Sequence, residues 1–85
     1  MPTNDNQLTQ LQVATLKALA DACNYSLSSH PPEQAILRKF PKNLRGDAKD
    51  CLKWLHRKGL CAKHPTHGQI TYQLTQEGLR LAYSL

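Results

Sequence analysis

Apolar residues recur every three or four positions between residues 8 and 23, and this spacing predicts an amphipathic helix with one buried face. Thr15 is the only polar residue on that face, and its hydroxyl is expected to bond to a carbonyl oxygen one turn earlier. Asp5 or Asn6 would cap this helix, and Asn24 would end it. The face consists of Leu8, Leu11, Thr15, Leu16, Leu19, Ala20 and Cys23.

The next segment predicts a very short strand and then a short helix. Residues 25–29 alternate loosely around Leu27, which is the pattern of a strand. A Pro-Pro pair followed by Glu33 starts a second helix, because proline fits a first turn and a carboxylate suits the positive end of the helix dipole. Phe40 belongs to this helix, and Pro41 stops it.

A third helix is predicted to begin at Lys42 or Asn43 and to run to Lys58, with Gly59 as its stop. Gly46 weakens the first turn, so a start a few residues later also fits the sequence. The buried face of this helix consists of Leu44, Ala48, Cys51, Leu52 and Leu55.

A β-hairpin and a last helix complete the pattern. Residues 60–64 and 69–74 predict two short strands, and the turn-forming residues between them predict a hairpin. Thr75 caps a last helix that carries Leu79, Leu81 and Ala82. The sequence therefore predicts an α+β fold of the winged helix-turn-helix type, with a three-helix core, a small antiparallel β-hairpin wing and a short C-terminal helix. Residues 1–7 are expected to be a flexible N-terminus, and residues 8–85 a single winged-helix domain.

Two stretches of the chain resemble winged-helix regulators. One looks like the end of their recognition helix, which often reads Leu-x-x-Lys-Gly-Leu, and it is Leu52-Lys53-Trp54-Leu55-His56-Arg57-Lys58-Gly59-Leu60. The other is similar to their Tyr-x-Leu-Thr-x-x-Gly ending after the wing, and it is Tyr72-Gln73-Leu74-Thr75-Gln76-Glu77-Gly78-Leu79-Arg80-Leu81-Ala82. The resemblance covers most of the chain and points to the superfamily that includes the multiple-antibiotic-resistance-type regulators. It implies DNA binding by the third helix.

The resemblance leaves the oligomeric state open. Regulators of this kind usually add long helices for dimerisation, and this sequence stops about ten residues past the wing. A homodimer, and with it the reading of a palindromic site, is therefore kept as an alternative to a monomer.

The charge pattern favours a polyanionic partner. Eleven Lys and Arg residues stand against six Asp and Glu residues, a formal net charge of +5, which favours nucleic acid or an anionic membrane surface. On a helical wheel at 100° per residue, five cationic residues of the third helix fall in a strip with an arc of roughly 120°. Asp47 and Asp50 lie outside this basic strip. A DNA duplex would relieve the repulsion within this strip, and a solvated basic face that binds nothing is the plainer alternative. The strip consists of Lys42, Arg45, Lys49, Lys53 and Arg57.

Each candidate residue has an expected role. Near the start of the helix, Asn43, Arg45 and Lys49 would approach base edges. Phosphates would be held by Lys42, Lys53 and Arg57, and the wing residues Lys63, His67 and Gln69 would touch a flanking minor groove or the backbone. The wing residues are equally well explained as an exposed turn.

The predicted function is sequence-specific binding of double-stranded DNA by a transcriptional regulator, with the third helix in the major groove. One alternative is a protein-interaction module that uses Trp54, the wing or the last helix. The other is RNA binding, which would want exposed aromatic side chains that this sequence offers in small number.

Other chemistry has little support in the sequence. Cys61-x-x-His64-x-x-His67 holds residue types that bind zinc, but a structural zinc site needs four ligands and this spacing matches no usual pattern. Because no catalytic motif stands out either, we predict no enzyme activity, no cofactor, no metal and no small-molecule ligand. No secretory signal or long apolar run is found, so a cytoplasmic protein with reduced thiols and no membrane partner is expected, nucleoid-associated in a bacterium or archaeon.

Overall fold

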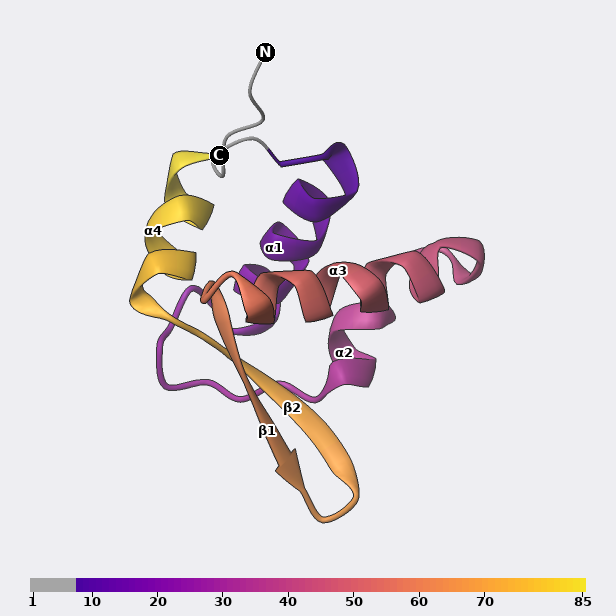
Figure 1. Cartoon of the computed structure of the whole chain (residues 1–85). Coiled ribbons are helices and arrows are strands. Elements are labelled where there is room, and N and C mark those ends of the chain that lie inside the picture. The colour runs from indigo at the N-terminus through magenta and orange to yellow at the C-terminus, as the bar shows by residue number, and fades with distance from the viewer. Residues whose placement is uncertain (1–7) are drawn as a thin grey trace.

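The computed structural model describes residues 8–85, in which four α-helices and a two-stranded antiparallel sheet form an α+β fold (Figure 1). In Figure 1, α3 crosses α1, the hairpin projects below α3, and α4 lies on the far side of α1 from α2. Residues 1–7, predicted to be flexible, lie outside the described residues. The elements are α1 Gln10–Ala22, α2 Glu33–Leu37, the 3-10 helix η1 Lys42–Leu44, α3 Arg45–Arg57, β1 Cys61–Thr66, β2 Gln69–Leu74 and α4 Gln76–Ser84.

The first helix starts at a reciprocal cap. The hydroxyl of Thr9 accepts the backbone N–H of Gln12 at 3.1 Å, and the side-chain oxygen of Gln12 accepts the N–H of Thr9 at 2.9 Å. This capping box satisfies two of the N–H groups that a helix start leaves unpaired. The cap is therefore Thr9 and not Asp5 or Asn6, which lie outside the described residues.

The predictions for Thr15 and Asn24 are confirmed. The hydroxyl of Thr15 donates to the carbonyl oxygen of Leu11 at 2.7 Å, which satisfies this polar group inside the core. Asn24 follows the helix with a φ of 54°, in the left-handed region that commonly ends helices.

The strand predicted at residues 25–29 is wrong, because this part of the described chain forms a turn. Tyr25 has a φ of 53°, and the Ser26 hydroxyl accepts the backbone N–H two residues further on at 3.2 Å. Serine hydroxyls offer the backbone such local partners in competition with a sheet. The chain bonds to the hairpin further along the sequence, where the carbonyl oxygen of Pro31 accepts the N–H of Tyr72 at 3.0 Å.

The second helix is shorter than predicted, and the third begins at Arg45, which agrees with the later of its two predicted starts. Helix α2 begins at Glu33, as expected, but it ends at Leu37, and the chain then turns through Phe40. Beyond Pro41 the chain first winds as η1, in which the N–H of Leu44 bonds to the carbonyl oxygen of Pro41 at 2.9 Å. Because a 3-10 helix has three residues per turn, the directions of side chains in η1 differ from those on an α-helical wheel.

The hairpin closes with a two-residue turn, not with the predicted loop of residues 65–68. His67 and Gly68 have φ angles of 48° and 78°, the combination that a type I′ turn requires. Strand β1 therefore extends through Pro65, which lies opposite Ile70. Proline is tolerated there because β1 is an edge strand of a two-stranded sheet.

Helix α4 is held against the end of α3 by its own first turn. The hydroxyl of Thr75 accepts the N–H of Gly78 at 3.1 Å, which confirms the predicted cap, and donates to the carbonyl oxygen of Gly59 at 2.7 Å. Gly78 faces the backbone of Leu60 so closely that a Cβ atom would clash with the carbonyl oxygen of that residue. Only glycine permits this approach between α4 and the chain that enters the hairpin.

The core lies between α1, α2, α3 and the inner face of the hairpin, and leucine is its commonest residue. Most of the predicted buried residues of α1 and α3 point into it, Leu11 and Leu44 are half-buried against its edge, and Leu8 lies half-buried before the start of α1. Within residues 8–85, no helix has the length and apolar character needed to cross a membrane. The residues with no exposed surface include Leu16, Leu19, Ile36, Leu52, Leu55 and Tyr72.

Candidate nucleic-acid interface

The outer face of α3 carries a row of exposed cations. Lys49, Lys53 and Arg57 are spaced four residues apart, so they follow one side of the helix and stay in solvent. The buried residues Ala48, Cys51, Leu52 and Leu55 occupy the other side. We call Lys49, Lys53 and Arg57 the α3 basic row.

Lys42 and Asn43 precede the row in η1, and both are exposed. Their 3-10 winding sets their directions apart from those of α3, so the structure does not align them with Lys49 as an α-helical wheel does. They lie between the turn that follows α2 and the first residue of α3.

Arg45 is half-buried and holds the end of α2. Its Nε donates to the carbonyl oxygen of Leu37 at 3.2 Å and to that of Phe40 at 3.0 Å. Leu37 is the last residue of α2, and its carbonyl oxygen also accepts the backbone N–H of Phe40 at 3.0 Å, whereas Phe40 lies in the turn that follows the helix. Arg45 therefore links α2 to α3, and this contact restricts its predicted approach to base edges.

Lys49 lies beside a sheltered carboxylate. Its Nζ is 4.0 Å from Oε1 of Glu33, whose side chain is only 12% exposed, whereas the side chain of Lys49 is 48% exposed. Oε2 of Glu33 accepts a hydrogen bond from the hydroxyl of Tyr72 at 3.2 Å. Burial, and then the Glu33 carboxylate, raise the pKa of Tyr72 well above its ordinary value, so this hydroxyl keeps its proton.

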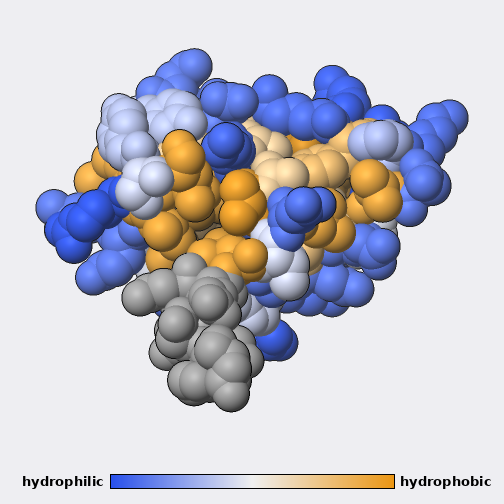
Figure 2. Space-filling view, turned by 90° about the horizontal axis from the view of Figure 1, so that it is seen from above, coloured by the Kyte–Doolittle hydropathy of each residue, from blue (hydrophilic) through white to orange (hydrophobic). Residues whose placement is uncertain are grey.

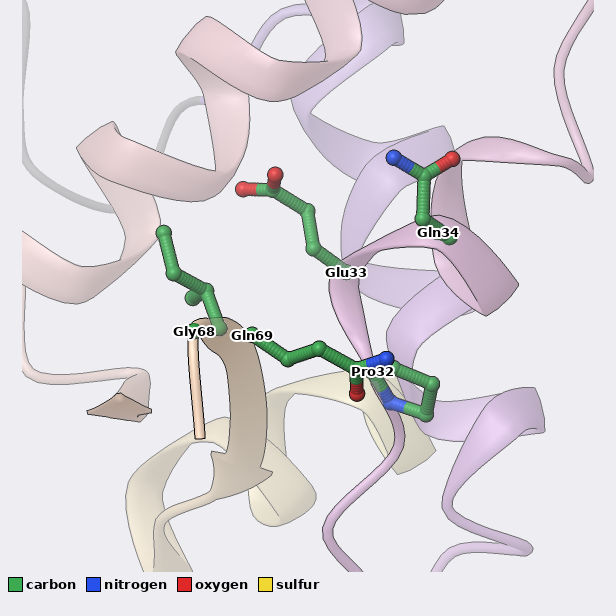
Figure 3. Close-up of a pocket in the computed structure, with 6 residues that line it drawn as sticks. Pro32, Glu33, Gln34, Gly68 and Gln69 are labelled. Carbon is green, nitrogen blue, oxygen red and sulfur yellow. The ribbon is translucent and has the colours of Figure 1, made fainter. Parts of the chain in front are cut away.

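The hairpin presents its three predicted contact residues at different places. Lys63 is exposed on β1 opposite Tyr72, and His67 is exposed at the turn. The side chain of Gln69 extends toward Pro32 (Figure 3). The structure therefore exposes all three residues, and the side chain of Gln69 is turned toward the start of α2.

A cavity of about 180 Å³ separates the start of α2 from the hairpin turn (Figure 3). This volume is below the range of roughly 300–1,000 Å³ that is usual for pockets binding small organic ligands. The residues that line it are Pro32, Glu33, Gln34, Gly68, Gln69 and Ile70.

Two cations that the sequence analysis missed lie next to the third helix. Arg38 and Lys39 are exposed in the turn between α2 and η1. The helical wheel omitted them because it covered one helix, although they stand only a few positions before Lys42 in the sequence. With Lys42 they extend the positive surface from α3 to the end of α2.

Trp54 lies between the buried and exposed faces of α3, as its position on the wheel indicates. It is half-buried against the core, and Nζ of Lys58 lies 5.8 Å from the centre of its ring. This distance is within the range of a cation–π interaction. Trp54 is thus part of the packing at the edge of the core.

The cysteine thiols are buried, whereas a reactive thiol is accessible and readily loses its proton. Burial raises the pKa of Cys61 from 9.0 to about 12, and it also raises the pKa of Cys23 and of Cys51. The thiolate is the reactive form, and burial disfavours it. Cys61 and His64 are an odd number of positions apart on β1, so they point to opposite faces of the hairpin. The Cys61-x-x-His64-x-x-His67 sequence therefore forms no common site.

Comparison with known proteins gives no family for this chain: it matches no protein-family model, no curated protein and no solved structure.

Proposed function

We propose that residues 8–85 form a winged-helix domain, with α2 and α3 as the helix-turn-helix and the β1–β2 hairpin as the wing. We further propose that it binds specific double-stranded DNA as a transcriptional regulator, with α3 in the major groove. The observation that supports this most is the α3 basic row, which stays exposed on the side of α3 opposite its buried residues. An α-helix about 10–12 Å across fits a major groove about 12 Å wide.

The proposed contacts follow from position along α3. Lys49 and Asn43 lie near the start of the third helix and would approach base edges, and Lys53 and Arg57 would hold phosphates. Arg38, Lys39 and Lys42 would contact the DNA backbone beside them. On the wing, Lys63 and His67 would reach a flanking part of the duplex.

The proposal is tested by titrating a fluorescent DNA duplex at two salt concentrations with the native protein and with the double variant Lys49→Ala/Lys53→Ala. Each lost phosphate contact is expected to reduce the slope of log affinity against log salt by about 1. The matched control is Lys17→Ala/Arg80→Ala, which removes the same charge from exposed positions on α1 and α4.

The control should keep the native slope, and the Lys49 and Lys53 variant should weaken binding and flatten the slope. Negligible affinity of the native protein at low salt would end the proposal. Equal losses of DNA affinity in the two variants would show that net charge alone attracts the DNA. Single-stranded RNA serves as competitor, and we expect it to compete weakly because Tyr83 is the one exposed side chain among the Phe, Trp and Tyr residues of residues 8–85.

A second candidate, a protein-interaction module, is supported by the apolar end of α4. Tyr83 and Leu85 are 68% and 44% exposed, and an open groove of about 370 Å³ runs along α4 beside Leu60 and Leu81. Figure 2, which views the molecule from above Figure 1, shows apolar side chains gathered among hydrophilic ones. Sedimentation equilibrium of the native chain and of Tyr83→Ala tests the simplest partner, a second copy, which a palindromic DNA site would need.

A further inference from the structure

The outer face of the hairpin holds two histidine rings in contact. His64 on β1 and His30 in the segment before α2 have ring centres 5.1 Å apart and ring planes inclined by 58°. The segment is fixed at this place by the backbone bond between Pro31 and Tyr72. His30 and His64 therefore meet through a backbone arrangement that does not depend on the rings themselves.

Hydrogen bonding fixes the proton position on His64. The side-chain nitrogen of Gln73 donates to the carbonyl oxygen of Leu27, which can only accept. The side-chain oxygen of Gln73 thus faces Nε2 of His64 at 2.9 Å, so Nε2 must carry the proton in the neutral ring. Nδ1 of His64 is left with its lone pair.

This arrangement is the usual one for a metal-binding histidine. Such residues donate one ring N–H to an oxygen acceptor, which orients the ring and raises the basicity of the other nitrogen. His30 is exposed and its ring forms no hydrogen bond within residues 8–85, so neither ring nitrogen is engaged by another described residue. The pair consequently offers two imidazole nitrogens for one ion.

The spacing of the rings fits chelation. Two imidazoles bound to one ion at about 2.0–2.1 Å, with a tetrahedral angle between the bonds, have ring centres roughly 5 Å apart. The observed 5.1 Å is close to this value. Aromatic rings in simple contact also lie about 4.5–7 Å apart, so the spacing permits chelation and the fixed proton on His64 favours it.

We propose that His30 and His64 together bind a divalent transition-metal ion such as Zn²⁺, Ni²⁺ or Cu²⁺. Within residues 8–85 no group of three or more potential ligands is gathered, so water molecules would complete the coordination. The ion would join the segment before α2 to the hairpin, on the face away from Cys61 and Tyr72. This inference is independent of the proposed DNA binding.

The proposal is tested by calorimetric titration of the full chain with ZnCl₂, NiCl₂ and CuCl₂, and with MgCl₂ as a cation that prefers oxygen ligands. We expect one ion per chain, with Cu²⁺ bound more tightly than Ni²⁺ or Zn²⁺ and no binding of Mg²⁺. His30→Ala and His64→Ala should each abolish the site, whereas His56→Ala and His67→Ala, which alter exposed histidines elsewhere, should leave it unchanged.

A further variant separates chelation from simple ring contact. Gln73→Leu removes the acceptor for Nε2 of His64 but leaves both ligands, so it should weaken metal binding roughly tenfold or more. Zn²⁺ should also raise the unfolding temperature of the native chain and not that of His30→Ala, whose exposed ring has no part in the core. Unchanged metal affinity in His30→Ala, or loss of binding in His67→Ala, would overturn the proposal.

Discussion

The carboxylate of Glu33 connects three elements at the level of single residues. It lies in α2, accepts a hydrogen bond from Tyr72 on β2, and stands 4.0 Å from Nζ of Lys49 on α3. Its mostly buried carboxylate therefore lies beside a residue of the α3 basic row. A DNA phosphate that approaches Lys49 must compete with Glu33 and is repelled by it.

Replacing Glu33 by Gln is therefore expected to strengthen DNA binding at low salt. The substitution keeps the shape of the side chain and a hydrogen-bond acceptor for Tyr72, but it removes the charge near Lys49. Exposed ion pairs contribute about 0.2–1 kcal/mol, which corresponds to an increase in affinity of up to about fivefold. The measurement is the titration of a DNA duplex described above, at low and high salt.

Tyr72→Phe is the control for this variant, because it removes the hydrogen bond to Glu33 without changing any charge. It should leave the affinity for DNA unchanged. The gain in Glu33→Gln should shrink at high salt, where charges are screened. An affinity equal to that of the native protein at low salt would show that Glu33 does not limit the contact between Lys49 and DNA.

Among the elements, two helices contain a glycine whose surroundings differ. Gly78 in α4 lies against the backbone of Leu60, whereas Gly46 in α3 has nothing within 4 Å of the position of a Cβ atom. Both glycines have ordinary helical φ angles, so an added methyl group meets no strain from the backbone conformation itself. The two positions differ in their surroundings alone.

We expect Gly78→Ala to destabilise the protein and Gly46→Ala to stabilise it. At position 78 the methyl group would force α4 away from Leu60, at a cost of about 1–3 kcal/mol. At position 46 the methyl group meets no neighbour, and the better helix propensity of Ala would add about 0.5–1 kcal/mol. Urea unfolding of the two variants measures both changes, and the same sign in both would contradict the contact seen at Gly78.

The arrangement of the elements themselves was largely predictable. The helices α1, α3 and α4, the hairpin and the cap at Thr75 were found from apolar spacing and local turn chemistry. The strand at residues 25–29 was wrong, and the hairpin turn was assigned four residues in place of two. Both errors arose where short polar segments permit several local conformations, and contacts with the rest of the chain select one of them.

At the scale of the whole molecule, the core protects several acidic protons. Cys23, Cys51, Cys61 and Tyr72 are all buried, and burial raises the pKa of each above its value in an unfolded chain. The folded state therefore holds these protons at pH values where the unfolded state releases them. The core is thereby stabilised at neutral pH relative to alkaline pH.

Stability is expected to fall as the pH rises above about 9. The unfolded chain loses the Cys61 proton near pH 9.0, while the folded chain keeps it up to about 12, so stabilisation is complete below pH 9 and decreases through that interval. Urea unfolding at pH 8 and pH 10 under reducing conditions measures the loss. Cys61→Ala should show a smaller loss between these pH values, and an equal loss would assign the effect to other groups.

The candidate site was only partly predictable from the sequence. The exposure of Lys49, Lys53 and Arg57 followed from the helical wheel, because the wheel needs only the period of one helix. The contact of Arg45 with Leu37 and Phe40 could not be predicted from the helical wheel, because it depends on how α2 packs against α3.

The buried faces of the helices and most of their first and last residues follow from local sequence, because they depend on residues within one or two turns of each other. Tertiary structure alone decided which distant side chains meet. Glu33 and Tyr72 bond although they are 39 positions apart, and His30 reaches His64 only because its segment lies along the hairpin. Such contacts are set by the packing of whole elements, and the spacing of residues along the sequence does not directly indicate that packing.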